Sequence, residues 1–362
     1  MKGGPANAAR RAHAVDLLRL VASFQMITGH TVAALLEPSA REGRLYAWWD
    51  WARGLTAVAF MLAAGLAYHL STLARIEAHL ASPEAQRARV RRALMLIGIG
   101  YAMHFPIGAL SGDASVRAAA WSEFASVDVL QCIGVTLLLL EALTRGLRDA
   151  RRVALACGAL AVAAVPIAPW LAPMERGGID APLVAYLTRR GGSLFPLVPW
   201  SGFVLGGVAI GALALPRGAA TSPERATLGL VAIAAVMGVL GAPAYVLGDA
   251  PSEEHAYAAW PPLALVRIAC VLLVTAALSA ASARLVAFPR WARTLAGETL
   301  VLYVAHLMVL YVGGVGLARV LGPTLSLPVT LVIAAAQVLG CSVLALGWAR
   351  WSARRASGGT AH

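Results

Sequence analysis

Long apolar segments recur along this sequence and limit what it can fold into. From residue 17 to residue 349, stretches of about 20 mostly apolar residues follow one another with only short polar segments between them. A helix of about 20 residues rises about 1.5 Å per residue and therefore spans the roughly 30 Å of hydrocarbon in a bilayer. The pattern predicts an all-α, polytopic integral membrane helical bundle.

Ten such segments can be delimited. The predicted spans are 17–36, 55–73, 93–110, 127–143, 153–173, 196–215, 227–247, 262–283, 298–318 and 327–349. They form one transmembrane domain, residues 16–350, between an N-terminal tail of residues 1–15 and a C-terminal tail of residues 351–362. Because the number of spans is even, both tails are predicted on the same side of the membrane.

The composition agrees with this class. Apolar residues make up 59% of the 362 positions and charged residues only 13%, whereas a soluble domain carries about 25% charged residues. The four cysteines all fall in apolar segments and show neither a CxxC pair nor Cys/His ligand spacing. We therefore expect no disulfide framework and no metal.

The basic residues indicate the orientation. If the N-terminus is cytoplasmic, the segments on that side, including the arginine-rich segment 74–92, hold most of the 30 Lys and Arg residues. Because cytoplasmic loops carry the excess of Lys and Arg in membrane proteins, both termini are predicted to be cytoplasmic. The basic balance is thus explained by topology, and we predict no nucleic-acid partner. The expected location is the plasma membrane of a bacterium.

Aromatic residues gather in the predicted outer segments. Trp48, Trp49, Trp51, Trp121 and Trp260 all lie there. One interpretation is an interfacial belt that anchors the protein among the lipids. The other is that some of these rings, Trp49 among them, line a site where sugar rings stack.

Ionisable side chains within a span are costly in lipid and often mark function. Arg19 and His30 lie in the first predicted span, eleven positions apart. Eleven steps of about 100° return to within about 20° of the start and rise about 16 Å, so both side chains are predicted on one stripe of the helix. His30 suits a general base and Arg19 suits a phosphate or carboxylate. The alternatives are a packing hydrogen bond for His30, and for Arg19 snorkelling with Asp16 as its partner.

Four further ionisable residues within the predicted spans draw attention for the same reason, together with the uncharged Gln131. They are His69, His104, Arg267 and His306. A buried partner and a functional site are both open for His104 and His306. His69 and Arg267 can reach the membrane surfaces by snorkelling, and Gln131 can simply hold two helices together.

The spacing of Arg19 and His30 resembles the Arg-x10-His signature of the transmembrane acyltransferase superfamily. That superfamily includes the acyltransferase-3 and the heparan-α-glucosaminide N-acetyltransferase-like proteins. Other segments resemble its motifs in the same order along the chain. They are Arg53 to Gly65, Val129-Leu-Gln-Cys-Ile-Gly134, Phe195-Pro-Leu-Val-Pro-Trp200 with Gly206 and Gly207, and Glu298 to His306.

This resemblance implies transfer of an acyl group, typically acetyl from acetyl-CoA in the cytoplasm, to a hydroxyl or amine of an extracytoplasmic glycan or glycolipid. It makes His30 the central catalytic residue, Arg19 its partner and His306 a further candidate. The segment 37–54 contains no histidine, although the lysosomal heparan enzyme is thought to use one there, and Ala64 stands where many acyltransferase-3 members have Ser. These departures focus the expected chemistry on His30.

The remaining expected roles follow from that reaction. Arg19 and two arginines of the cytoplasmic segment, Arg91 and Arg92, are predicted to hold the phosphates of CoA. Arg267, His104, Gln131 and Trp49 are predicted to contact the substrate. His30 can act as a general base or carry the acyl group itself, and the acceptor can be a hydroxyl or an amine. Besides the membrane lipids, a homodimer partner is also possible. The competing functions are a proton-coupled secondary transporter that uses the buried His and Arg residues, and a non-catalytic scaffold.

Overall fold

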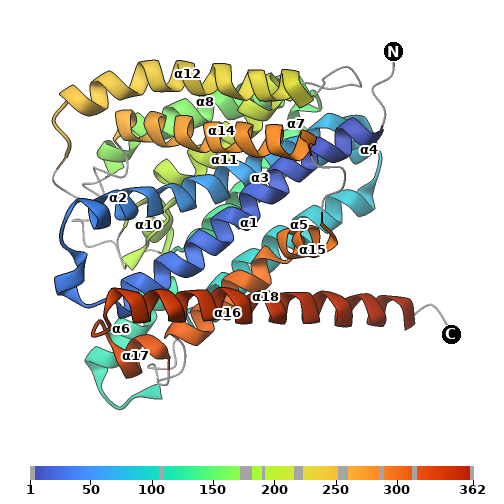
Figure 1. The fold of residues 1–362 in the computed structure, drawn as a ribbon. Helices are drawn as coiled ribbons and strands as arrows, with labels where there is room; N and C mark the ends of the chain where they lie inside the picture. The colour runs from blue at the N-terminus through green and yellow to red at the C-terminus, as the bar shows by residue number, and fades with distance from the viewer. Residues whose placement is uncertain are drawn as a thin grey trace. The chain divides into compact units, whose positions relative to one another are not determined.

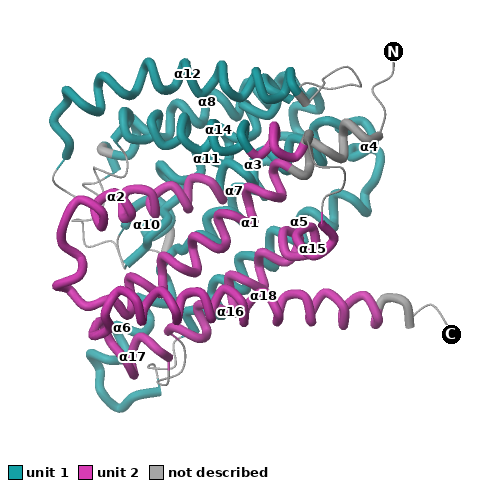
Figure 2. Tube along the Cα trace, in the orientation of Figure 1, with its two compact units in different colours: residues 1–9, 61–277 teal, residues 10–60, 278–362 magenta. Residues whose placement is uncertain are grey.

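The computed structural model describes residues 5–105, 110–171, 182–189, 192–215, 223–251, 260–284, 289–311 and 316–358. Nearly all of these residues are helical, and one isolated parallel bridge joins Leu36 to Leu325 (Figure 1). The predicted all-α bundle is therefore confirmed. The chain forms two compact units (Figure 2). Unit 1 comprises Met1–Ala9 and Met61–Ala277, and unit 2 comprises Arg10–Phe60 and Leu278–His362.

Unit 1 contains most of the long apolar helices, together with shorter ones. Its elements are α3 (Leu55–Ser71, from Met61 on), α4 (Ile76–Leu80), α5 (Pro83–Met103), α6 (Ala114–Ala125), α7 (Val129–Leu147), α8 (Ala150–Leu171), α10 (Pro182–Leu187), α11 (Leu197–Ala214), α12 (Pro223–Leu247) and α14 (Pro261–Arg284, to Ala277), with the 3₁₀ turn η2 (Leu73–Arg75) before α4. Three helices begin at polar caps: the side chains of Ser82, Asp113 and Asp128 accept hydrogen bonds from the first backbone N–H groups of α5, α6 and α7. These caps explain where the polar segments give way to helix.

Small residues let the helices of unit 1 approach closely. A Cβ built at Gly65 of α3 would lie 2.0 Å from the carbonyl oxygen of Val204 in α11, and one at Gly207 would lie 2.5 Å from that of Leu62. Such contacts replace the hydrophobic driving force, which is absent between helices in lipid.

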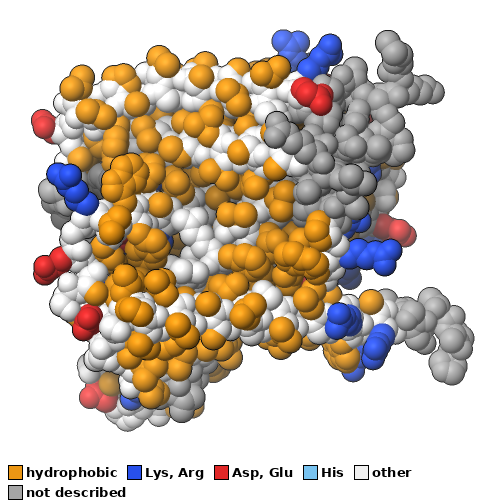
Figure 3. Space-filling view, viewed as in Figure 1, with side chains coloured by type: hydrophobic (Ala, Val, Ile, Leu, Met, Phe, Trp, Pro, Cys, Tyr) orange, Lys and Arg blue, Asp and Glu red, His pale blue; other side chains and the backbone are white. Residues whose placement is uncertain are grey.

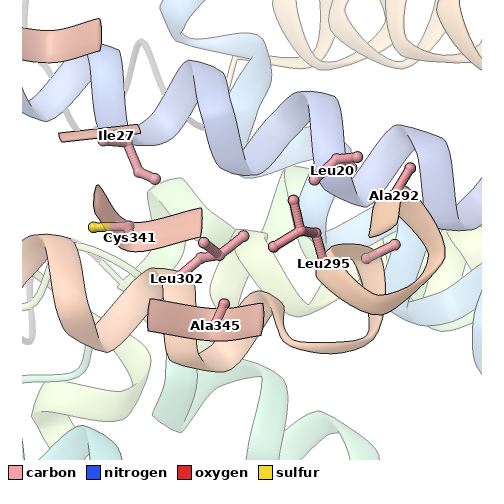
Figure 4. Close-up of a cluster of buried hydrophobic side chains, with 8 residues drawn as sticks. Leu20, Ile27, Ala292, Leu295, Leu302, Cys341 and Ala345 are labelled. Atoms are coloured by element: carbon pink, nitrogen blue, oxygen red, sulfur yellow. The ribbon is translucent and has the colours of Figure 1, made fainter. Parts of the chain in front are cut away.

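Unit 2 is built from both ends of the chain. Its elements are α1 (Pro5–Leu35, from Arg10 on), η1 (Pro38–Arg41), α2 (Arg44–Arg53), α15 (Arg290–Gly297), α16 (Thr299–Tyr311), α17 (Leu317–Leu321) and α18 (Leu327–Gly358), together with the first residues of α3 and the last of α14. Helices α15 and α16 meet at Glu298 with a bend of 69°. Leu20 and Ile27 of α1 pack with Leu295, Leu302 and residues of α18 (Figure 4).

One stripe of α18 is buried, and the rest of the helix is exposed or partly exposed. The buried residues recur every three or four positions: Thr330, Ala334, Gln337, Cys341 and Ala345. Val332, Leu339 and Val343 on the other faces are exposed. Apolar side chains cover much of the visible surface of this helix, and basic side chains lie at its C-terminal end (Figure 3). An apolar helix with a single buried stripe is expected at a lipid boundary.

Seven helical stretches of the described residues are long and apolar enough to cross a membrane, or eight if the bent pair α15–α16 counts as one span. Helices α1 and α5 form where spans 17–36 and 93–110 were predicted but are not among the seven. Both carry charged side chains, such as Arg19 in α1 and Arg91 in α5, that lower their hydropathy. The α5 helix also begins ten residues before the predicted span, at Pro83. The count of ten spans and the orientation of the termini remain predictions.

Candidate functional site

The polar residues of α1 face α16. Arg19 Nη2 donates to Thr299 Oγ1 over 2.6 Å, and His30 Nδ1 lies 3.1 Å from His306 Nε2. The predicted common stripe of Arg19 and His30 is thereby confirmed. The eleven steps from Arg19 to His30 on α1 rise about 16 Å, and the seven steps from Thr299 to His306 rise about 10 Å. The long side chain of Arg19 makes up much of that difference.

Between these two polar contacts the interface is apolar. Leu20 and Ile27 of α1 and Leu302 of α16 are buried there in one cluster (Figure 4). These apolar side chains therefore separate the guanidinium of Arg19, near the middle of α1, from the imidazole of His30, near its C-terminal end. The spacing in the sequence predicts the two groups on one stripe, but it does not predict the packed apolar side chains between them.

Arg19 also keeps the local partner expected for it. Its Nη1 lies 3.9 Å from Asp16 Oδ1, and its side chain is 21% exposed. The contact with Thr299 is shorter and joins two helices, so Arg19 has a tertiary as well as a local role.

The hydrogen bonds of the two histidines assign their protons. His306 is fully buried, and its Nδ1 lies 2.9 Å from the carbonyl oxygen of Leu302. Because a carbonyl only accepts, His306 Nδ1 carries the proton, and in a neutral ring Nε2 then accepts. The hydrogen bond to His306 must therefore be donated by His30 Nδ1. His30 Nε2 is left with the lone pair, as a general base requires.

A glutamine on α18 hydrogen-bonds the backbone of His306. Gln337 Nε2 donates to the backbone oxygen of His306 over 3.0 Å, and Gln337 Oε1 accepts a short hydrogen bond from the hydroxyl of Thr31. Gln337 thus links α16 to the turn of α1 that carries His30. Neither Gln337 nor Thr299 was predicted from the sequence, because a single polar residue in an apolar helix does not reveal its partner.

Residues at the C-terminal end of α2 pack against α1 close to His30. Gln25 Nε2 donates to the backbone oxygen of Ala52 over 2.8 Å and fixes the end of α2 against α1. The stem of Arg53 lies against Gly29, since a Cβ there would be 3.0 Å from Arg53 Cδ. The guanidinium carbon of Arg53 lies 5.8 Å from the ring centre of Trp49. Trp49, a predicted substrate-binding residue, is therefore linked to the α1 turn of His30 through Arg53.

The other predicted site residues belong to unit 1. Arg91 and Arg92 are exposed on α5, and Arg267 is half-buried on α14. Gln131 Oε1 closes the capping box of α7 with Asp128, which accounts for its burial by a local structural role.

His104 follows the last turn of α5. Its Nδ1 lies 3.0 Å from the backbone oxygen of Gly100, and the side chain lines an open depression of about 430 Å³. Ser122, Glu123 and Ser126 also line it. The depression offers polar groups on a surface that the topology prediction places outside.

A buried ionic network in unit 1 was missed by the sequence reasoning. Glu141 of α7 accepts from His79 Nε2 at 3.0 Å and from Arg145 Nε at 2.9 Å, and Tyr68 Oη lies 3.4 Å from it. The spacing of Glu141 and Arg145, four positions apart in a helix, was the available signal. The network holds α4 to α7.

Comparison with known families decides what kind of protein carries this site. The sequence model of heparan-alpha-glucosaminide N-acetyltransferase, catalytic, matches residues 11–248. The chain belongs to that family. A search of curated proteins finds no match.

Membership in the heparan-alpha-glucosaminide N-acetyltransferase family confirms the resemblance drawn from the motifs. With the apolar helices, it identifies an integral, multi-pass membrane protein of an acetyltransferase family. The matched region contains Arg19, His30 and Arg53 and ends before Thr299 and His306. Among the described residues, no group of three or more His, Cys, Asp or Glu side chains could hold a metal ion.

Proposed function

We propose that this protein transfers an acetyl group from cytoplasmic acetyl-CoA to the amine of a sugar on the far side of the membrane, with His30 as the general base. The observation that carries the proposal is the contact of His30 Nδ1 with His306 Nε2, which leaves His30 Nε2 free of its proton. The name of the family supports N-acetyl transfer to a glucosaminide. A hydroxyl acceptor would use the same base.

The chemical step follows from that proton arrangement. A neutral amine attacks the carbonyl carbon of the thioester, and His30 Nε2 takes the proton that the nitrogen loses as the C–N bond forms. The tetrahedral intermediate then expels the thiolate of CoA as the C–S bond breaks. His30 returns its proton to the sulfur, so the enzyme ends as it began.

His306 makes the base effective. When His30 gains a proton on Nε2, its bond to His306 becomes charge-assisted and therefore stronger. The buried His306 is in turn fixed by Leu302 and Gln337. His306 is thus the positioning residue of the pair, comparable to the carboxylate that orients the histidine of a hydrolase triad.

Arginines near the predicted cytoplasmic face would hold the donor. Arg19 lies at the inner end of the α1 stripe, and Arg91 and Arg92 lie in the segment predicted to be cytoplasmic. A guanidinium binds phosphate through paired N–H donors, which suits the polyanionic CoA. No metal is required in this scheme, because the imidazole supplies the base.

The test is transfer by purified protein in proteoliposomes. Labelled acetyl-CoA and an oligosaccharide that ends in glucosamine should give labelled N-acetyl product, and His30→Gln should abolish it while acetyl-CoA still binds. Acceptor uptake without acetylation would instead support the transporter. Absence of both activities with a folded protein would refute the proposed enzyme.

A further inference from the structure

Arg53 is held beside the proposed base by the backbone of α1. Gly29 precedes His30, and the absence of a side chain there lets the Arg53 stem lie on the helix, with Cδ 3.0 Å and Cγ 3.1 Å from where a Cβ would be. Gln25 binds the backbone oxygen of Ala52, the residue before Arg53. The position of this side chain is therefore set from two directions.

The guanidinium is oriented as well as placed. Asp50 Oδ1 accepts from Arg53 Nε at 3.0 Å and from Nη2 at 2.6 Å, and the ring of Trp49 lies 5.8 Å from the guanidinium carbon. No acceptor among the described residues engages Nη1. The side chain of Arg53 is 39% exposed. The Nε and Nη2 atoms of Arg53 thus donate to Asp50, and Nη1 is available to a ligand.

The charge of Arg53 lies close to the proposed base. The Arg53 stem packs on Gly29, the residue before His30, and the ring centre of Tyr311 lies 6.3 Å from that of His30. A cation beside a general base is unfavourable once the base has taken a proton, because two positive charges then face each other. The arrangement becomes favourable when a negative charge develops between them.

Acyl transfer creates such a charge. As the acceptor attacks, the electron pair of the thioester C=O bond moves onto oxygen and forms an oxyanion that collapses when the thiolate leaves. We infer that Arg53 is a catalytic residue whose Nη1 donates to this oxygen and stabilises the oxyanion. The inference rests on the proposed function. Arg53 contacts the turn of α1 that carries His30, because its stem lies against Gly29.

The test compares Arg53→Met, which keeps the stem and removes the charge, with wild type. Loss of an oxyanion donor lowers kcat by about 10²–10³-fold, and we expect that loss with an unchanged Kd for acetyl-CoA. Arg53→Lys should keep part of the rate. Free guanidinium in the millimolar range should restore activity to Arg53→Ala, which a purely structural role would not allow.

Gly29→Ala gives an independent test that leaves Arg53 in place. Alanine is a better helix former than glycine, so the helix is kept. The added Cβ moves the Arg53 stem by a few tenths of an ångström, and kcat should fall by about tenfold, since small misplacements of catalytic groups are costly. Gly340→Ala on α18 is the matched control, because a Cβ there meets nothing within 4 Å.

The outcomes separate the two proposals. If wild type transfers acetyl and His30→Gln does not, but Arg53→Met keeps kcat within twofold or changes only KM for the acceptor, the oxyanion role is refuted while the enzyme stands. If wild type transfers nothing, the proposed function itself fails. Thermal melting of each variant in detergent distinguishes either result from misfolding.

Discussion

The Nδ1 atom of His30 lies 3.1 Å from the Nε2 atom of His306, a residue 276 positions later in the chain. The contact joins the first helix of the family-matched region to a helix beyond its end. The proton arrangement of the proposed base is therefore set by a segment that the family match does not include.

Replacing His306 by Phe should disable the base while leaving the donor site intact. Phe keeps a flat ring of slightly larger size, but His30 Nδ1 loses the nitrogen that accepts its hydrogen bond. We expect kcat to fall by about 10²-fold or more, because a general base contributes about 10²–10⁴-fold. Steady-state rates and acetyl-CoA binding measure the two effects. Met308→Leu, on an exposed face of α16, is the control, and an active His306→Phe variant would refute the pairing.

Gln337→Met tests whether α18 positions His306. The substitution keeps the length of the side chain but removes the hydrogen bonds to the His306 carbonyl and the Thr31 hydroxyl. The Thr31 hydroxyl keeps its hydrogen bond to the Ile27 carbonyl, so the variant loses the link between α16, α18 and α1 but not every partner of Thr31. A typical hydrogen bond contributes about 0.5–1.5 kcal/mol. We expect a lower melting temperature and a kcat reduced by about tenfold, with KM for acetyl-CoA unchanged. A variant that melts earlier but keeps its kcat would assign Gln337 a structural role only.

The sequence alone predicts most of the helices and the shared helix face of Arg19 and His30. Long apolar segments predict helices wherever they occur, and the eleven-residue spacing of Arg19 and His30 places both on one face of a helix whatever else surrounds it. These are local properties, which the sequence contains directly. Helix α5 begins before its predicted span because Ser82 caps it and the arginine-rich segment that precedes the apolar residues is also helical.

The partners of those residues could not be predicted in the same way. Thr299 and Gln337 are ordinary polar residues in apolar helices, and only the tertiary fold brings them to Arg19 and His306. Arg53 was visible at the start of a family-like segment, yet its contact with Gly29 depends on the path of the chain between α1 and α2. Long-range contacts have no periodic signal in a single sequence.

Arg19 variants should separate donor binding from simple anchoring. Lysine keeps the charge of Arg19 but loses the forked donors, so Arg19→Lys should raise KM for acetyl-CoA by about tenfold with little change in kcat. Thr299→Val, which removes the acceptor of the 2.6 Å hydrogen bond, should act in the same direction. Asp16→Asn should have less effect, because partly exposed ion pairs contribute about 0–1 kcal/mol. If Asp16→Asn alone raised KM, the anchoring interpretation of Arg19 would be supported instead.

Two glycine substitutions distinguish close helix packing from helix propensity. A Cβ at Gly65 would lie 2.0 Å from the Val204 carbonyl oxygen and 2.8 Å from the Val208 backbone nitrogen, so α3 and α11 must move apart in Gly65→Ala. Overpacking of this kind costs about 1–3 kcal/mol, and we expect earlier melting in detergent. At Gly98 of α5 a Cβ meets nothing within 4 Å, and alanine there should be neutral or stabilising because glycine is the poorer helix former. Equal melting temperatures for the two variants would show that α3 and α11 do not depend on this backbone contact.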